Sequence, residues 1–407
     1  MRLLTSDSWL GLRLSPDVSS LTWLDFSDAE RKRALAIVEL LGRSETRDEL
    51  GLGAIRDAFA EAMFPGMSTV QRRARYFLFV PWTFRDIERR FSGRTGALER
   101  ARRQELLLIE ALLGAGESDG VIGGRARKDL RQVSSMIYWS GLERWGIRRV
   151  SGSREQWSRS LARSRGAAVD DDGQLVSTLG SWWHSGLPEP PDDWPGTASL
   201  ELREDDAEYL RERIRERCAG SLLATLAERR EPWTEVAFAW QLEMPDLSDA
   251  QRRLRDHAQR FSETMHGAAL LYNHELARAH ENDERIEHYR GLLDGWVQRE
   301  SVADRSATPL PDTWVLLGDI GARYSSRTRE FVEEWFSLTT DPSAVVSDGR
   351  LVARVRAREL DVKKGQARLS FDAARETWRG AAGAGQLEYR WASTQRQLLD
   401  IIDVGGA

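Results

Sequence analysis

Apolar residues recur every three or four positions along most of this chain, which is the spacing of helices that bury one face. The pattern predicts helices over 97–113, 126–145, 203–299, 314–336 and 387–402. Residues 351–360 and 366–371 instead look like two short strands joined by a tight turn, which predicts a β-hairpin. We therefore expect a mainly α, multi-helical fold with a small β-hairpin element near the C-terminus.

Residues 51–84 predict two short helices separated by a turn at Phe64-Pro65-Gly66. Ser68 and Gln71 have the spacing of a capping box, so the second helix should start near Thr69, just after Ser68. Proline interrupts helices, so this helix should end at Pro81. The cations on its surface would be Arg72, Arg73 and Arg75.

Two breaks divide the chain. Residues 185–196 are rich in proline and favour an extended linker, and 301–312 form a weaker break of the same kind. We predict three domains, which are an Arg- and Trp-rich helical domain over 1–185, a helical domain over 197–300 and an α+β domain over 313–407.

The composition suits a globular protein outside the membrane. Of the 407 residues, 41% are hydrophobic and 30% are charged, and the longest apolar run is far too short to cross a bilayer. The lone Cys218 excludes an intramolecular disulfide and any zinc site built from several thiolates. With no segment that resembles a signal peptide, these features predict a cytoplasmic protein without membrane partners.

Positive charge is concentrated between Arg72 and Arg165. This window holds 21 Lys and Arg against 10 Asp and Glu, a net of +11, although the whole chain carries −5. Guanidinium groups suit phosphate recognition because each presents several donors in a rigid fork. Aromatic residues interleaved with them, including Tyr138, Trp139, Trp145 and Trp157, could stack on unpaired bases. Ordinary solvated helix faces, or pairing with acidic residues outside the window, would explain the same pattern.

The residues predicted to contact nucleic acid are Arg72, Arg73, Arg75, Arg125, Arg127, Lys128, Arg131, Arg148 and Arg149. A helix-turn-helix built from 97–113 and 126–145 is a further possibility, but the connection is much longer than that motif needs.

Metal-dependent chemistry has little support. Glu263 and His266 match the Glu-x-x-His step of di-iron bundles, but the rest of such a site is missing. Asp348 followed by Asp361 and Lys363 has the order of some nuclease sites. Neither a phosphate-binding glycine loop nor a serine nucleophile elbow occurs. We predict no catalytic residue, no metal and no cofactor.

The block from Gly51 to Phe84, GLGAIRDAFAEAMFPGMSTVQRRARYFLFVPWTF, resembles the signature of an uncharacterised bacterial family, a domain of unknown function. Similar motifs stand at Leu21 to Ser27, Ser134 to Trp139 and Tyr389-Arg390-Trp391. The resemblance covers nearly the whole chain and is weakest over 155–310. It implies no activity, but it does imply a bacterial protein often encoded near anti-phage defence genes.

These observations predict a non-catalytic protein that binds DNA or RNA, as an accessory component of a bacterial anti-phage defence assembly with other defence proteins as partners. Two alternatives stay open. One is a scaffold that docks proteins through exposed tryptophans without touching nucleic acid, and the other is a metal-dependent nuclease.

Overall fold

The computed structural model describes residues 48–91, 94–125, 130, 132–163, 168–169, 175–176 and 181–404. Within them the chain forms fourteen α-helices, and the strands β1 (Ala168–Val169) and β2 (Leu175–Val176) pair as one antiparallel ladder. The mainly helical prediction is confirmed.

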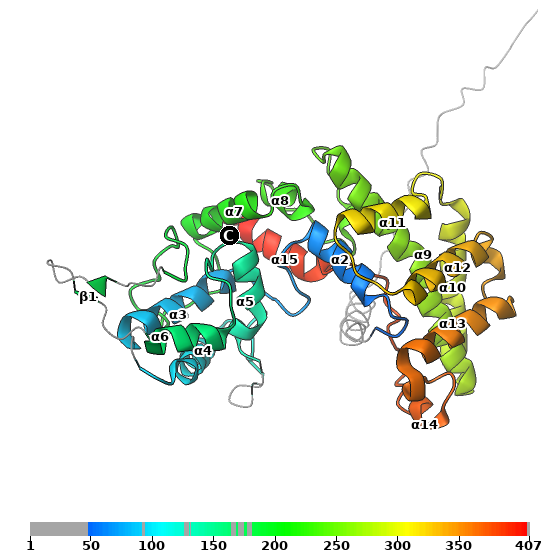
Figure 1. The fold of residues 1–407 in the computed structure, drawn as a ribbon, viewed down its shortest axis with the longest axis horizontal. Helices are drawn as coiled ribbons and strands as arrows, with labels where there is room; N and C mark the ends of the chain where they lie inside the picture. The colour runs from blue at the N-terminus through cyan, green and yellow to red at the C-terminus, as the bar shows by residue number, and fades with distance from the viewer. Residues whose placement is uncertain are drawn as a thin grey trace, which may run out of the picture.

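The helices form two groups (Figure 1). The first lobe contains α3 (Tyr76–Phe91), α4 (Ala97–Gly114), α5 (Ser134–Arg144), α6 (Arg154–Arg163), α7 (Glu204–Arg217) and α8 (Leu222–Ala227). The second lobe contains α9 (Asp249–Ala279), α10 (Asp283–Val302), α11 (Leu310–Asp319), α12 (Ser326–Leu338), α13 (Gly349–Lys363) and α14 (Asp372–Arg375). Short 3₁₀ turns lie at η2 (Ala239–Gln241), η3 (Pro342–Ala344) and η4 (Lys364–Gln366).

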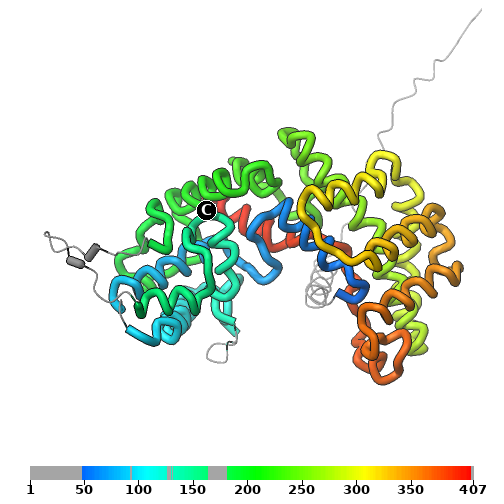
Figure 2. The backbone as a smooth tube through the Cα atoms, in the orientation of Figure 1, coloured from blue at the N-terminus to red at the C-terminus, as the bar shows by residue number. Residues whose placement is uncertain are grey.

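Two helices from opposite ends of the chain lie between the lobes. They are α2 (Gly53–Met63) and α15 (Trp391–Ile402), drawn blue and red in the middle of Figure 2. The C-terminal α15 packs on α7 and α8, whereas the N-terminal α2 packs on α9 and α11. These contacts join elements from different predicted domains. The division of the chain into domains over 1–185, 197–300 and 313–407 stays a prediction.

The core of the first lobe is built around α3. Nine consecutive residues, Tyr76 to Phe84, are buried, as expected of a helix surrounded by other elements on every side. The ring of Phe77 stacks on Trp145, with centroids 3.8 Å apart. Helix α3 also runs through Pro81, so the predicted end at this proline is wrong.

The predicted start of this helix beside Ser68 is also wrong, because α3 begins at Tyr76. The amides that would open an earlier helix are bonded to side chains from distant segments. The hydroxyl of Tyr138 accepts from the amides of Arg72 (2.8 Å) and Arg73 (3.2 Å), and Asp400 accepts from that of Ala74 (2.8 Å). These tertiary bonds hold the segment open, although the Ser68 amide does donate to Gln71 as predicted.

The predicted C-terminal β-hairpin is absent from the described residues. Its first strand is part of α13, because Leu351, Val355 and Glu359 are buried at steps of four, which is helical spacing. Its second strand is a turn in which the amides of Arg368 (2.7 Å) and Leu369 (2.9 Å) donate to the buried Glu359 carboxylate. A side chain therefore takes the donors that a strand partner would have taken.

One glycine fixes how closely α9 and α10 approach. A Cβ added at Gly267, in the middle of α9, would lie 2.4 Å from the ring of Trp296 on α10. Gly267→Ala should therefore destabilise the protein by about 1–3 kcal/mol through overpacking. The matched change Gly291→Ala, on an open surface of α10, should stabilise it by roughly 0.4–1 kcal/mol. Urea unfolding of both variants measures the two changes in stability. Equal changes in the free energy of unfolding would contradict the prediction.

Candidate nucleic-acid interface

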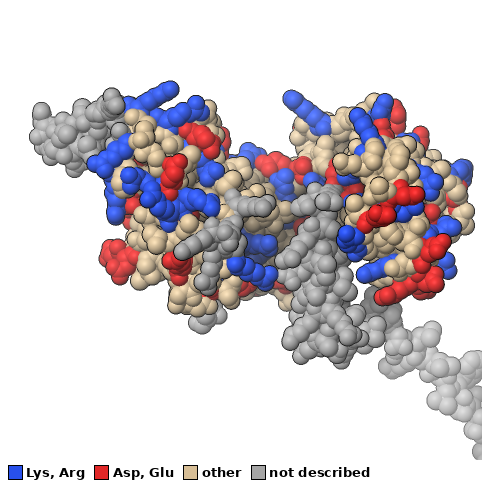
Figure 3. Space-filling model, turned by 90° about the horizontal axis from the view of Figure 1, so that it is seen from below, with Lys and Arg blue, Asp and Glu red and all other residues tan. Residues whose placement is uncertain are grey.

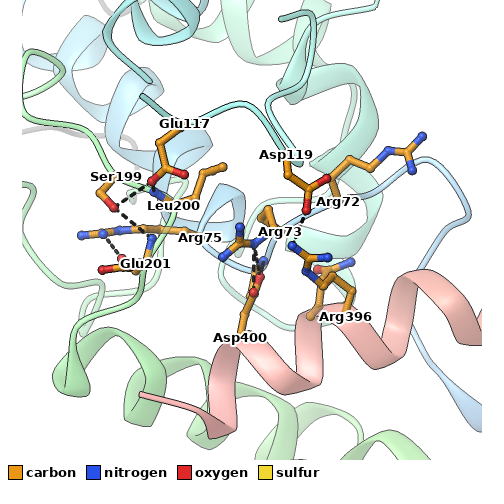
Figure 4. Close-up of polar contacts among 12 residues, drawn as sticks. Arg72, Arg73, Arg75, Glu117, Asp119, Ser199, Leu200, Glu201, Arg396 and Asp400 are labelled. Atoms are coloured by element: carbon orange, nitrogen blue, oxygen red, sulfur yellow. Dashed lines mark hydrogen bonds and ion pairs between the residues drawn. The ribbon is translucent and has the colours of Figure 1, made fainter. Parts of the chain in front are cut away.

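Arg73 connects the segment before α3 to the C-terminal helix (Figure 4). Its Nε lies 2.9 Å from both carboxylate oxygens of Asp400 on α15, and both side chains are largely buried. Burial opposes the charge on Arg73, but the attraction of Asp400 outweighs it and raises the pKa of the guanidinium. This side chain is a structural ion pair and cannot reach a phosphate without breaking it.

Arg75 is equally committed to the fold. It is 6% exposed, donates to the carbonyl oxygen of Glu201, and lies 3.4 Å from the buried Asp206 on α7. Burial lowers its pKa. Arg72, by contrast, is exposed, and its guanidinium points away from the ion pairs in Figure 4. Of these three predicted contacts, only Arg72 is accessible to a ligand.

Arg148 and Arg149 are neighbours with opposite environments. Arg148 is 2% exposed, donates to the carbonyls of Trp139 and Val150 and to the carboxylate of Glu143, and lies 4.7 Å from the centre of the Trp139 ring. Burial lowers its pKa. Arg149 is exposed, and its backbone amide donates to the carbonyl of Trp182, while its side chain makes no hydrogen bond or ion pair with the described residues. Arg148 therefore supports the loop that presents Arg149.

Of the remaining predicted contacts, the structure describes one. Arg125 is exposed, whereas Arg127, Lys128 and Arg131 lie outside the described residues. The predicted stacking platform does not form where the structure describes it, because Tyr138, Trp145 and Trp157 are completely buried. Trp139 is half-buried, beneath Arg148.

Acidic residues from outside the basic window cancel part of its charge. Arg85 and Arg89 lie 2.6 Å and 3.5 Å from Glu189, and Arg144 lies 3.1 Å from Glu61. Sequence counting misses these pairs, since the partners are distant in the chain. The net positive charge of the window therefore overstates the positive potential at its surface.

A different set of arginines has no such partner. Arg94, Arg100, Arg103, Arg159 and Arg163, which we call the arginine face, have no carboxylate within 4.0 Å among the described residues. They lie on the neighbouring helices α4 and α6 and just before α4, and all are exposed except the half-buried Arg100, which covers the ring of Phe91. Exposed acidic residues on the same part of these helices are Glu99 and Glu155. The sequence does contain a signal for part of this face. Arg159 and Arg163 are four residues apart, on the side of a helix opposite the buried Trp157 and Leu161.

Figure 3 shows this lobe from below, with Lys and Arg more widely spread over it than Asp and Glu. Over the second lobe in the same view the two signs are more evenly mixed. The excess of positive charge on the first lobe therefore persists at the surface in part, away from the buried pairs of Arg73, Arg75 and Arg148.

The candidate nuclease residues do not converge. Asp348 caps the start of α13 and pairs with Arg350, whereas Asp361, near the end of the same helix, pairs with Arg327 and Arg358. Thirteen residues of helix separate the two carboxylates by about 20 Å, too far to share a metal ion. The described residues contain no group of three or more side chains arranged to hold a metal.

The two residues of the candidate di-iron motif, Glu263 and His266, bond to other groups of the protein. The Nε2 of His266 lies 3.2 Å from the carbonyl of Ala384, and the carboxylate of Glu263 accepts a hydrogen bond from Gln259. The lone Cys218 is buried, and burial raises the pKa of its thiol to about 11, so it is not a reactive thiolate.

The described part of the chain is thus a two-lobed helical protein with a set of exposed arginines on the first lobe that lack a carboxylate partner among the described residues. The chain belongs to the family of unknown function DUF6361, whose model matches residues 18–405. No match was found among curated proteins or among solved structures. The expected membership of an uncharacterised domain family is confirmed, while the defence-gene association stays a prediction.

None of the described helices has the length and apolarity that crossing a bilayer requires. The cytoplasmic location stays a prediction.

Proposed function

We propose that this protein binds a polyanion, most simply DNA or RNA, through the arginine face of its first lobe, without catalysing a reaction on it. The observation that carries the proposal is the set of guanidinium groups on α4 and α6 that have no carboxylate partner among the described residues. Unpaired surface arginines are available for the phosphate contacts that dominate nucleic-acid affinity.

The geometry of these side chains supports phosphate contact. The Nε atoms of Arg103 and Arg159 each donate to the carbonyl four residues earlier in their own helix, at 3.3 Å. This bond holds the stem of each side chain against its helix and leaves the outer nitrogens available. Because α4 and α6 pack against each other, their outer faces form one surface that could follow a nucleic-acid backbone.

Arg72, Arg125 and Arg149 are exposed and remain candidate contacts, whereas Arg73, Arg75 and Arg148 are not part of the proposed surface. Among the described residues, every tryptophan is buried or half-buried. This burial gives little support to a scaffold that docks partners through exposed tryptophans. Placement in an anti-phage defence assembly stays a prediction.

Replacing Arg103, Arg159 and Arg163 together by alanine should weaken binding to short DNA and RNA by about tenfold or more. Each lost phosphate contact should also lower the slope of log affinity against log salt by about 0.9, so the triple variant should lose nearly three units of slope. Fluorescence anisotropy over a salt series measures both quantities.

A matched control uses the second lobe. Arg290, Arg323 and Arg356 are exposed and also have no carboxylate partner within 4.0 Å in the described ranges, so their triple alanine variant removes the same charge from another surface. Affinity and salt slope should stay near wild type in this control. If the two triple variants weaken binding equally, the arginine face is not the binding surface.

A further inference from the structure

A cavity of about 350 Å³ lies beside α2, apart from the arginine face. Its walls come from the start of α2, residues 68–69, the middle of α9 and the segment that leads into α15. These segments are far apart in the sequence. The packing of α2 on α9, and hydrogen bonds from Arg390 to the carbonyl of Met67 and from Ser262 to the carbonyl of Leu387, bring them together. A cavity of this size falls at the lower end of the range for small-molecule sites.

Three residues of this lining each carry a buried polar atom that has no hydrogen-bond partner among the described residues: the Oε1 of Glu49, the Oγ of Ser68 and the Nδ1 of His266. Glu49 itself is only 5% exposed. Buried polar atoms without partners are uncommon in folded proteins, and each costs free energy until a donor or acceptor reaches it. Because all three belong to residues that line one cavity, they point to a ligand that supplies the missing bonds.

The hydrogen-bonding capacity of two of these atoms is settled by their neighbours. The carbonyl of Ala384 can only accept, so the Nε2 of His266 carries the proton and its Nδ1 presents a lone pair. Burial lowers the pKa of His266 to about 4, which keeps the ring neutral near pH 7. The other carboxylate oxygen of Glu49 already pairs with Arg368 at 2.9 Å and Lys363 at 3.5 Å, leaving Oε1 as an acceptor. The ligand must therefore bring donors.

The charges around the cavity indicate which kind of hydrogen-bond donor the ligand should carry. The lining contains the carboxylates Asp48, Glu49, Asp57 and Glu388 and the guanidiniums Arg56 and Arg390. Both guanidiniums are engaged by carboxylates of the protein, Arg56 with Asp57 at 3.1 Å and Arg390 with Glu61 at 3.3 Å. Glu49 and Asp57 are themselves paired with cations, whereas Asp48 and Glu388 have no cationic partner within 4.0 Å in the described part of the chain. These two carboxylates favour a cation over a neutral molecule.

We propose that this cavity binds a small organic cation with several N–H donors, such as a primary amine or a guanidine. Its N–H groups would donate to Glu49 and His266, and Ser68 would accept or donate beside them. Leu50 and Met265 supply apolar walls for an aliphatic stem. The proposal is independent of nucleic-acid binding, because the arginine face contributes no residue to the cavity.

Titration calorimetry of the full chain with agmatine, which carries both an amine and a guanidinium, tests the proposal. We expect saturable binding that Glu49→Gln and Ser68→Ala each weaken at least about fivefold. Ser68→Ala should fold normally, because the hydroxyl that it removes has no partner in the part of the chain that the structure describes. Glu105→Gln, at a buried carboxylate outside the cavity, should leave the affinity unchanged.

Histidine-selective NMR provides a second readout, since a donor at Nδ1 should shift the ring resonances of His266 and leave those of His257 in place. His257 is a suitable reference because its Nδ1 is already bonded to Thr313. The proposal is overturned if neither agmatine nor spermidine binds at millimolar concentration. It is also overturned if both bind the folded Glu49→Gln and Ser68→Ala variants as tightly as the wild type.

Discussion

Asp400→Ala should lower the free energy of unfolding by about 3–5 kcal/mol, although the substituted residue lies near the C-terminus. The carboxylate accepts from Arg73 at 2.9 Å through both oxygens and from the amide of Ala74 at 2.8 Å. Removing one member of a largely buried ion pair leaves the other charge without compensation, which costs far more than the pair contributes as a whole. Urea unfolding followed by circular dichroism measures the change.

Asp403→Ala is the matched control, because Asp403 is exposed one turn later on the same helix end. Surface changes of this kind usually shift stability by less than about 0.5 kcal/mol. The double variant Arg73→Met with Asp400→Leu should recover much of the loss, since it removes both charges together. A loss below about 1 kcal/mol for Asp400→Ala would show that the pair does not hold α15 in place.

Arg148→Ala should destabilise the protein by about 3 kcal/mol or more, although the same change at Arg149 should cost less than about 0.5 kcal/mol. Arg148 is 2% exposed and supplies donors to two carbonyls and to Glu143, all of which lose them in the variant. The flat guanidinium also covers the Trp139 ring. Thermal and urea unfolding of the two single variants give the comparison.

Arg148→Lys should rescue only part of this loss, because an ammonium group cannot match the planar fork that reaches several acceptors at once. If Arg148 were a nucleic-acid contact, its alanine variant would instead keep full stability and lose affinity. Measuring both quantities on the same preparation therefore separates the two roles of this residue.

Helical content followed from local pattern alone. The long amphipathic α9 begins where Ser248 and Gln251 form a capping box, and its buried positions recur at helical spacing. The family could also be anticipated, because short motifs are local properties of the chain.

The segment before α3 and the C-terminal hairpin were predicted wrongly for one common reason. At Arg72 to Ala74 and at Arg368 to Leu369, backbone amides bond to side chains of Tyr138, Asp400 and Glu359. These partners are distant in the sequence in most cases, so local propensity carries no information about them.

At the candidate site, too, the sequence predicted the amount of charge but not which charged groups are accessible. Counting correctly identified the first lobe as rich in arginine, but burial decided which guanidiniums are accessible. Arg73 and Arg75 lie one and three positions after the exposed Arg72. They nevertheless pair with Asp400 and Asp206, which are 327 and 131 positions away. The cavity beside α2 had no sequence signal, because its unpartnered atoms come from separate segments.

The amino-acid sequence by itself determined the helical class, the single cysteine and the excess of arginine in one part of the chain, because these depend on residue type and near-neighbour spacing. Only the tertiary structure decided where α3 begins, which arginines face solvent and which polar atoms meet at the cavity. Those outcomes depend on which distant residues come within about 3 Å of one another, the distance over which hydrogen bonds form.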